Sequence, residues 1–274
     1  HYDPVNRATL IKLENPYSEE YKYLRPNLRE NLLKVVSENI KRLVDKDILV
    51  FEVGKTFQST KGKIKEWHLA TGVLALLQKD DQAAFAQAKG VVDFTLNRLG
   101  ITKPWYDSFH ATPSYSPASL WHGKKGAEIK VGQKAIGFLG IIAPQITANL
   151  KLKGSVAVFS LSIQELLPLV AKERHYQSIS RFPAVLRDLA VLVPRQTKVV
   201  EVMNAMHTAG AKLIENIDLF DMYEGEHIPE GQKNFAFHII YQSKVRTLTG
   251  KEVDSVHQKI ISALQKNPAW EVRS

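Results

Sequence analysis

The sequence predicts an α+β protein of two units, each built on an antiparallel sheet. In residues 1–177, strand and helix patterns follow one another without the regular strand–helix–strand rhythm of a parallel sheet. In residues 178–274, the order is strand, helix, strand, strand, helix, strand, which is the split, ferredoxin-like plan. A charged and polar stretch at residues 172–180 separates the two units.

The composition is that of a soluble globular protein, with 44% hydrophobic and 24% charged residues in a chain of 274. No segment approaches the roughly 20 apolar residues of a membrane span, so we expect no membrane contact. The absence of Cys excludes disulfides and thiolate sites and permits a reducing, cytoplasmic location. Because the chain starts at His1 without Met or a signal pattern, we interpret it as a piece of a longer chain.

The net charge of +9 suggests a polyanionic partner, but the charge is unevenly placed. Residues 178–274 contain 12 Lys and Arg against 11 Asp and Glu, a net charge of +1. The remaining +8 lies in residues 1–177, much of it in loops rich in Lys, which a solvated surface explains more often than a nucleic-acid groove does.

The first unit opens with a helix that Asn27 can cap and Glu30 can complete as a capping box. Its apolar stripe predicts a helix of about 18 residues ending near Asp45. Apolar runs predict strands at residues 48–57, 66–77, 131–142 and 155–162. Helical spacing predicts helices at residues 89–99 and 164–170. Residues 104–126, rich in Ser, Pro and aromatic residues, are expected to form a long loop.

The second unit has clearer element signals. Alternation predicts strands at residues 188–194, 213–223, 234–242 and 270–273. One helix is expected at residues 198–209, where Gly210 closes it. A second helix begins at Thr249, and Glu252 supplies its capping box. Two helices cover one face of such a sheet and leave the other face open.

Strand parity predicts which side chains lie on the open face. The residues expected to face the helices are Leu189, Val191, Val193, Phe220, Met222, Phe235, Phe237 and Ile239. Their neighbours, expected to face outward, are Ala190, Asp221, Tyr223, Asn234, Ala236 and His238. An aromatic ring beside a carboxylate suits a nucleobase, because the ring stacks on the face of the base and the carboxylate accepts hydrogen bonds from its edge.

The sequence offers no catalytic constellation. A ligase that uses ATP needs cations to hold the phosphates, and no Arg occurs between Arg98 and Arg174. His68, His110 and His122 have no partner at metal-ligand spacing, so we interpret each as structural. No Ser–His–Asp set is present as a motif. We therefore expect no active site within this chain.

Taken together, the motifs resemble one family. The matching motifs in residues 178–274 are Phe182-Pro183-Ala184, Arg187-Asp188-Leu189-Ala190, Leu219-Phe220-Asp221-Met222-Tyr223, Ile228-Pro229-Glu230-Gly231-Gln232-Lys233 and Arg246-Thr247-Leu248-Thr249. Those in the first unit are Asn15-Pro16-Tyr17-Ser18, Leu24-Arg25-Pro26, Phe51-Glu52-Val53-Gly54 and Lys89-Gly90-Val91-Val92. With these motifs the chain resembles the C-terminal part of the bacterial phenylalanyl-tRNA synthetase beta chain over nearly its whole length.

The resemblance implies an assembly with a catalytic alpha subunit, two alpha and two beta chains, that joins phenylalanine to tRNA(Phe) in the cytoplasm with ATP and magnesium. It implies that residues 1–177 form a class II synthetase-like core that lacks catalysis and contacts the alpha subunit, and that residues 178–274 are a ferredoxin-fold anticodon-binding domain. No cofactor is expected in this chain itself.

The family's contacts to the first anticodon base fall on Ala190, Asp221, Tyr223 and Asn234. The family usually has Ser at the position of Asn234, so this chain keeps a polar side chain there but changes its geometry. Candidate phosphate contacts are Arg181, Arg187 and Arg246.

Two other functions remain open at this stage. An ACT-like regulatory module shares the order of elements, but the loop at residues 194–197 lacks the Gly common at its ligand site; stabilisation by free phenylalanine would favour it. A self-sufficient ligase is the other alternative, and ATP–pyrophosphate exchange by the isolated chain would support it.

Overall fold

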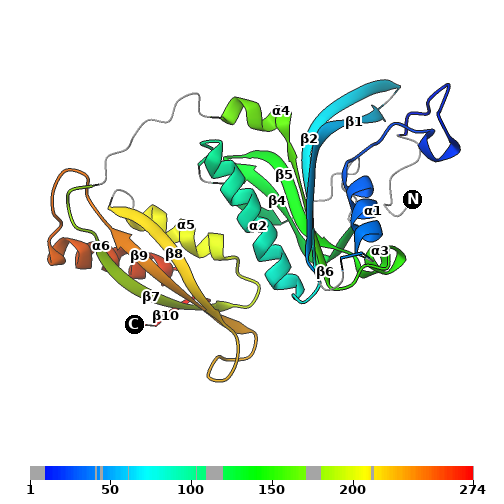
Figure 1. The fold of residues 1–274 in the computed structure, drawn as a ribbon. Helices are drawn as coiled ribbons and strands as arrows, with labels where there is room; N and C mark the ends of the chain where they lie inside the picture. The colour runs from blue at the N-terminus through cyan, green and yellow to red at the C-terminus, as the bar shows by residue number, and fades with distance from the viewer. Residues whose placement is uncertain are drawn as a thin grey trace. The chain divides into compact units, whose positions relative to one another are not determined.

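The computed structural model describes residues 10–40, 42–43, 46–60, 62–102, 104–108, 120–170, 180–210 and 213–273 (Figure 1). The chain divides into two compact units, residues 1–175 and 176–274. The boundary expected at residue 177 lies outside the described residues. The α+β class with antiparallel sheets is confirmed. No helix in the described ranges is long and apolar enough to cross a membrane.

The first unit is built on a six-stranded antiparallel sheet in the order β1-β2-β6-β5-β4-β3. The strands are β1 (Ile48–Thr60), β2 (Lys63–Leu76), β3 (Pro104–Ser108), β4 (Trp121–Val131), β5 (Lys134–Ile142) and β6 (Ser155–Ser162). The apolar end of β2 is buried on both faces, since Val73 and Leu74 belong to separate cores on the two sides of the sheet.

Helices cover both faces of this sheet (Figure 1). On one face lie α1 (Arg29–Asn39) and α3 (Pro144–Asn149); on the other lies α2 (Asp81–Arg98). The residues of α2 that pack on the sheet are spaced at four-residue intervals, Ala84, Ala88, Val92 and Leu96. Short turns complete the unit, namely η2 (Glu19–Tyr21), α4 (Ile163–Leu166) and η4 (Leu167–Leu169).

Several predicted boundaries in the first unit are wrong. The Oδ1 atom of Asn27 accepts from the Glu30 N–H at 3.1 Å, as expected, but α1 ends at Asn39, six residues before the predicted end. Helix α2 starts at Asp81 because Asp80 caps it, accepting from the N–H of Ala83 at 2.8 Å. The predicted strand 131–142 corresponds to β5, but its first three residues are the end of β4 and the turn at Gly132, which has a φ of +58°. The predicted loop 104–126 contains β3 and the start of β4, and its residues 109–119 lie outside the described ranges.

The second unit is a four-stranded antiparallel sheet in the order β10-β7-β9-β8. Its elements are β7 (Val185–Pro194), α5 (Val199–Gly210), β8 (Ile214–Tyr223), β9 (Gln232–Tyr241), α6 (Gly250–Leu264) and β10 (Glu271–Arg273). This confirms the predicted order of elements. Both helices pack on one face of the sheet, around the buried rings of Phe235 and Phe237, and the opposite face is left open.

Candidate nucleic-acid interface

The open face of the second sheet is ordered in rows, because directly paired residues of antiparallel strands point to the same side. One row runs from Arg273 through Ala190 and Ala236 to Asp221. The next row contains Asn234 and Tyr223, which are direct partners. Four of the six residues that parity placed outward, Ala190, Asp221, Tyr223 and Asn234, therefore share one surface. Two alanines form its flat centre, and a carboxylate and a phenol stand at its β8 edge.

A β-bulge at Phe220 sets this arrangement. Leu219 pairs with inward-facing Phe237, whereas Asp221 pairs with outward-facing Ala236, so Phe220 is the extra residue between them. Without the bulge, strict alternation from Leu219 would turn Asp221 inward. The prediction that Phe220 faces the helices is wrong, since its side chain is 49% exposed and lies on the open face.

On that face, the ring of Phe220 stacks on the imidazole of His238, with 3.9 Å between ring centroids and 15° between ring planes. The Nδ1 atom of His238 lies 2.7 Å from the Oδ1 atom of Asp188, its direct partner on β7. The carboxylate thereby holds the imidazole under the phenyl ring. The exposure of Phe220 was not predicted from the sequence, because no local sequence signal indicates a β-bulge at this position.

The ring of Tyr223 packs against Gly225 in the turn that follows β8. A Cβ atom added to Gly225 would lie 2.6 Å from the phenolic Oη of Tyr223, so only Gly allows the ring to occupy this place. The side chain stays 46% exposed and available for stacking. Beside it, the Oδ1 atom of Asn234 is buried and has no hydrogen-bond partner.

The three candidate arginines differ in their surroundings. Arg187 donates to Asp254 of α6 at 3.0 Å. Arg246 donates to both carboxylate oxygens of Glu252 at 2.9 and 2.5 Å. These hydrogen bonds, followed by those from Thr249, lower the pKa of Glu252 to about 2. Arg181 is exposed.

Arg273 was not singled out from the sequence, although it lies in the row of Ala190 and Asp221. Three strand spacings of about 4.8 Å separate its backbone from that of Asp221. Among the described residues, the side chain of the exposed Arg273 has one ion pair, a long one of 3.6 Å with Glu271. Strand alternation at residues 270–273, applied in the same way as for the other three strands, would have placed Arg273 on the open face.

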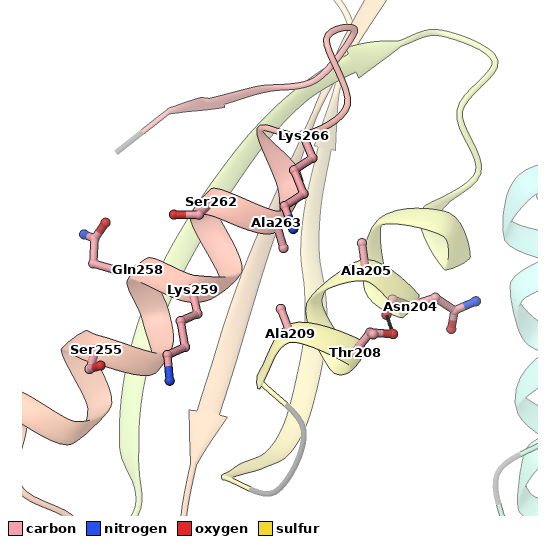
Figure 2. A pocket seen from close by; sticks show the side chains of 10 residues that line it. All are labelled: Asn204, Ala205, Thr208, Ala209, Ser255, Gln258, Lys259, Ser262, Ala263 and Lys266. Carbon is pink, nitrogen blue, oxygen red and sulfur yellow. Dashed lines mark hydrogen bonds between the residues drawn. The ribbon is translucent and has the colours of Figure 1, made fainter.

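The helix side of the second unit carries a hollow of about 810 Å³ between α5 and α6 (Figure 2). Small side chains from both helices line it, among them Ala205, Ala209 and Ala263. The residues predicted to contact a base are all absent from its lining. The hollow is therefore separate from the open face.

In the first unit, His122 has a carboxylate partner that sequence spacing did not reveal. Its Nδ1 atom lies 2.8 Å from the Oδ2 atom of Asp81, and Lys125 and Ser155 also donate to this carboxylate, at 2.7 and 2.6 Å. Burial raises the pKa of Asp81, but the three hydrogen bonds outweigh burial and lower it to about 2. The cluster joins the start of α2 to β4 and β6, which fits the structural role expected for His122. His110 lies outside the described residues.

Comparison with known proteins identifies the class of the second unit. Residues 180–273 match the family model of the ferredoxin-fold anticodon binding domain, which makes the second unit a domain of that class. Residues 2–163 match the model of the phenylalanyl tRNA synthetase beta chain CLM domain. The chain belongs to the phenylalanyl-tRNA synthetase beta chain family.

Two relatives illustrate the match. The phenylalanine–tRNA ligase beta subunit of Bacillus thuringiensis subsp. konkukian is 34% identical over 98% of this chain and 33% of its own length. That of Geobacillus kaustophilus is 33% identical over 96% of this chain and 33% of its own. The chain thus spans about a third of the length of these relatives. The solved pyrrolysyl-tRNA synthetase of Desulfitobacterium hafniense shares 16% identity over 61% of this chain and 58% of its own, with a TM-score of 0.45, too low to support an inference.

The family match replaces the ACT-like regulatory alternative, because the model that fits residues 180–273 is that of an anticodon-binding domain.

Proposed function

We propose that this chain is part of a phenylalanine–tRNA ligase beta subunit, in which the second unit binds the anticodon of tRNA(Phe). The first unit contacts the alpha subunit and has no active site of its own. The assembly has two alpha and two beta chains and works in the cytoplasm. The observation that carries the proposal is the exposure of Asp221 and Tyr223 on one sheet face that the helices leave open.

The anticodon of tRNA(Phe) begins with guanine, whose edge carries N–H donors. The ring of Tyr223 stacks on the face of this base, which contributes about 1–3 kcal/mol. The carboxylate of Asp221 accepts hydrogen bonds from the guanine edge, which adenine does not present in the same form. Ala190 and Ala236 let the base lie close to the sheet. A donor on the bound nucleotide supplies Asn234 Oδ1 with the partner that it lacks.

Phosphate contacts complete the proposal. Arg181 is exposed and is the first candidate, and Arg273 is added because it lies in the row of Asp221. Arg187 and Arg246 remain candidates, but each must give up part of an ion pair with α6 to reach a phosphate.

The test is the assembled enzyme with Tyr223→Ala in its beta subunit. Loss of the ring should weaken binding of tRNA(Phe) about tenfold, measured as Kd or as the KM for tRNA, with little change in the KM for phenylalanine. Tyr223→Phe keeps the ring and should bind normally. A KM for tRNA within twofold of the unchanged enzyme would refute the stacking role.

Asp221→Asn tests the reading of the base edge. The amide keeps the shape but replaces one acceptor oxygen by a donor, so it should lower the preference for guanine over adenine at the first anticodon position. Equal preference in Asp221→Asn and the unchanged enzyme would contradict the proposed hydrogen bonds.

The proposed contact with the alpha subunit lies on β1, which is an edge strand of the six-stranded sheet. Three alternate residues of β1, Leu49, Phe51 and Val53, are 51%, 77% and 59% exposed. They pair with Leu74, Gly72 and Ala70 of β2 and lie on the same face of the sheet as α2, which covers the more central strands. The apolar core therefore continues to an uncovered sheet edge, as expected of a surface that a partner covers.

Phe51→Glu tests this contact, because a charge in a covered apolar surface should prevent the alpha subunit from co-purifying. Phe94→Glu is the matched control, since Phe94 is 68% exposed on α2, away from the sheet edge. Retention of the alpha subunit by Phe51→Glu would place the contact elsewhere.

ATP and magnesium belong to the assembled enzyme in this proposal. In the described part of the chain, no three His, Asp or Glu side chains are grouped as metal ligands would be. These residues do not fit magnesium, and the proposal assigns ATP and magnesium to the alpha subunit.

A further inference from the structure

The first unit contains a cavity of about 180 Å³ that the anticodon proposal does not use. It lies on the same face of the sheet as α1 and α3. Two of its lining residues, Phe138 of β5 and Ser160 of β6, are direct partners in the sheet. Its walls are largely apolar, formed by Trp67, Leu69 and Phe138 among others. A cavity of about 150 Å³ accommodates a benzene ring, so this one has room for a single ring with a short substituent.

One polar group in the wall lacks a partner. Thr56 lines the cavity with its side chain 1% exposed, and its Oγ1 atom has no hydrogen-bond partner. The other buried threonine of this sheet, Thr71, is satisfied, since its Oγ1 lies 2.7 Å from the Oγ of Ser160. A buried hydroxyl without a partner is costly, and a ligand in the cavity would remove this cost.

The charge of the wall selects the ligand. Glu128 and Glu165 line the cavity, whereas Lys, Arg and His are absent from its lining among the described residues. Each carboxylate has one lysine partner outside the lining: Lys130 at 3.2 Å from Glu128 and Lys134 at 2.5 Å from Glu165. A carboxylate has further acceptor positions, so both can still accept hydrogen bonds from a ligand.

We infer that this cavity binds a small aromatic amine, with the ring between Trp67 and Phe138 and the ammonium group toward Glu128 and Thr56 Oγ1. The ammonium group donates to these oxygens and gains further attraction from the aromatic wall. A ligand that carries a carboxylate is disfavoured, because its charge would meet Glu128 and Glu165 without a cation in the lining. The site thus discriminates against free amino acids, including phenylalanine.

The test uses the 274-residue chain with benzylamine as the probe and the four tryptophan indole N–H signals as reporters. Of these tryptophans, only Trp67 lines the cavity. Benzylamine should shift the Trp67 signal saturably and leave that of Trp270, which belongs to the second unit, unchanged. Toluene, which lacks the ammonium group, should bind at least several-fold more weakly, and phenylacetate and phenylalanine should not bind.

Two variants test the polar contacts. Glu128→Gln removes the charge of this side chain, while Lys130 keeps its ion pair with Asp107 at 2.8 Å. The variant should bind benzylamine about tenfold more weakly. Asp107→Asn is the matched control, because it removes the other partner of Lys130 outside the cavity and should leave binding unchanged.

Thr56→Val removes the hydroxyl without changing the shape of the side chain. It should weaken benzylamine about fivefold without lowering the Tm, whereas Thr71→Val, which breaks a hydrogen bond, should lower the Tm. The inference is overturned if benzylamine gives no saturable shift of Trp67, if phenylacetate binds equally well, or if both Glu128→Gln and Thr56→Val bind benzylamine normally. None of these outcomes depends on tRNA binding.

Discussion

The phenyl ring of Phe220 lies parallel to the imidazole of His238, 3.9 Å away between centroids, on the sheet face that carries Tyr223. The contact exists because Phe220 is the extra residue of a β-bulge and turns to the same side as Asp221. The open face therefore carries two exposed aromatic side chains, Tyr223 and Phe220, and the exposure of Phe220 was not expected from alternation.

Phe220→Leu should weaken tRNA(Phe) binding by the assembled enzyme about fivefold, because the bulge keeps an apolar residue but loses a ring on which a base can stack. Met222→Leu is the matched control, since Met222 is similarly exposed but pairs with inward-facing Phe235. If both substitutions change the Kd equally, Phe220 has no specific part in binding.

Gly225→Ala should displace the ring of Tyr223, because the new methyl group would lie 2.6 Å from its Oη. We expect weaker tRNA binding with an unchanged Tm, since the ring is half-exposed and can move aside. In the Tyr223→Ala background the same substitution should have no further effect, because no ring remains to be displaced. Additive losses of tRNA affinity in the double variant would contradict this coupling.

Arg181→Ala should reduce the slope of log Kd against log salt concentration by about 1, as expected on loss of one phosphate contact. Arg246→Ala should leave this slope unchanged and lower the Tm, because Arg246 holds the Glu252 of the α6 capping box. A changed salt slope in Arg246→Ala would show that the arginine leaves its ion pair to contact RNA.

Asp81→Asn should lower the free energy of unfolding of the first unit by about 2 kcal/mol at pH 7, because the pKa of Asp81 falls from 3.8 to about 2 on folding. A lowered folded-state pKa stabilises above about pH 4, and this contribution is lost as the pH falls toward 2. The variant should therefore show a flatter dependence of stability on pH in that window.

Urea unfolding at pH 7, 4 and 2, followed by fluorescence, measures this effect. Trp270→Phe in both proteins restricts the signal to the three tryptophans of the first unit. Equal stability of the two proteins at pH 7 would show that the hydrogen bonds from His122, Lys125 and Ser155 do not stabilise the fold.

Local chemistry was enough to predict the order of elements in the second unit. The capping box of Thr249 and Glu252 forms as expected, with Thr249 Oγ1 accepting from the Glu252 N–H, because both partners lie within four residues of each other. The predicted outward position of Tyr223 is confirmed, although the bulge at Phe220 and not simple alternation along the whole strand produces it. Its role in binding a base stays a prediction.

Elements that depend on distant partners were predicted less well. Most of β4 was not predicted, because residues 121–126 were interpreted as part of a loop and the partners that complete this strand lie on β3 and β5. The carboxylate partner of His122 is 41 residues away in the sequence, so spacing could not reveal it. Such contacts form only when the sheet brings separate strands together.

The amino-acid sequence by itself determined the periodicity of the strands and helices, the caps of α6 and the presence of an acid beside an aromatic ring at residues 221 and 223. Tertiary structure decided that Phe220 forms a bulge against β9, and this bulge turns Asp221 and Tyr223 outward while Leu219 stays in the core. The physical reason is that a bulge is a property of two paired strands, whose register is set by the packing of both against the helices.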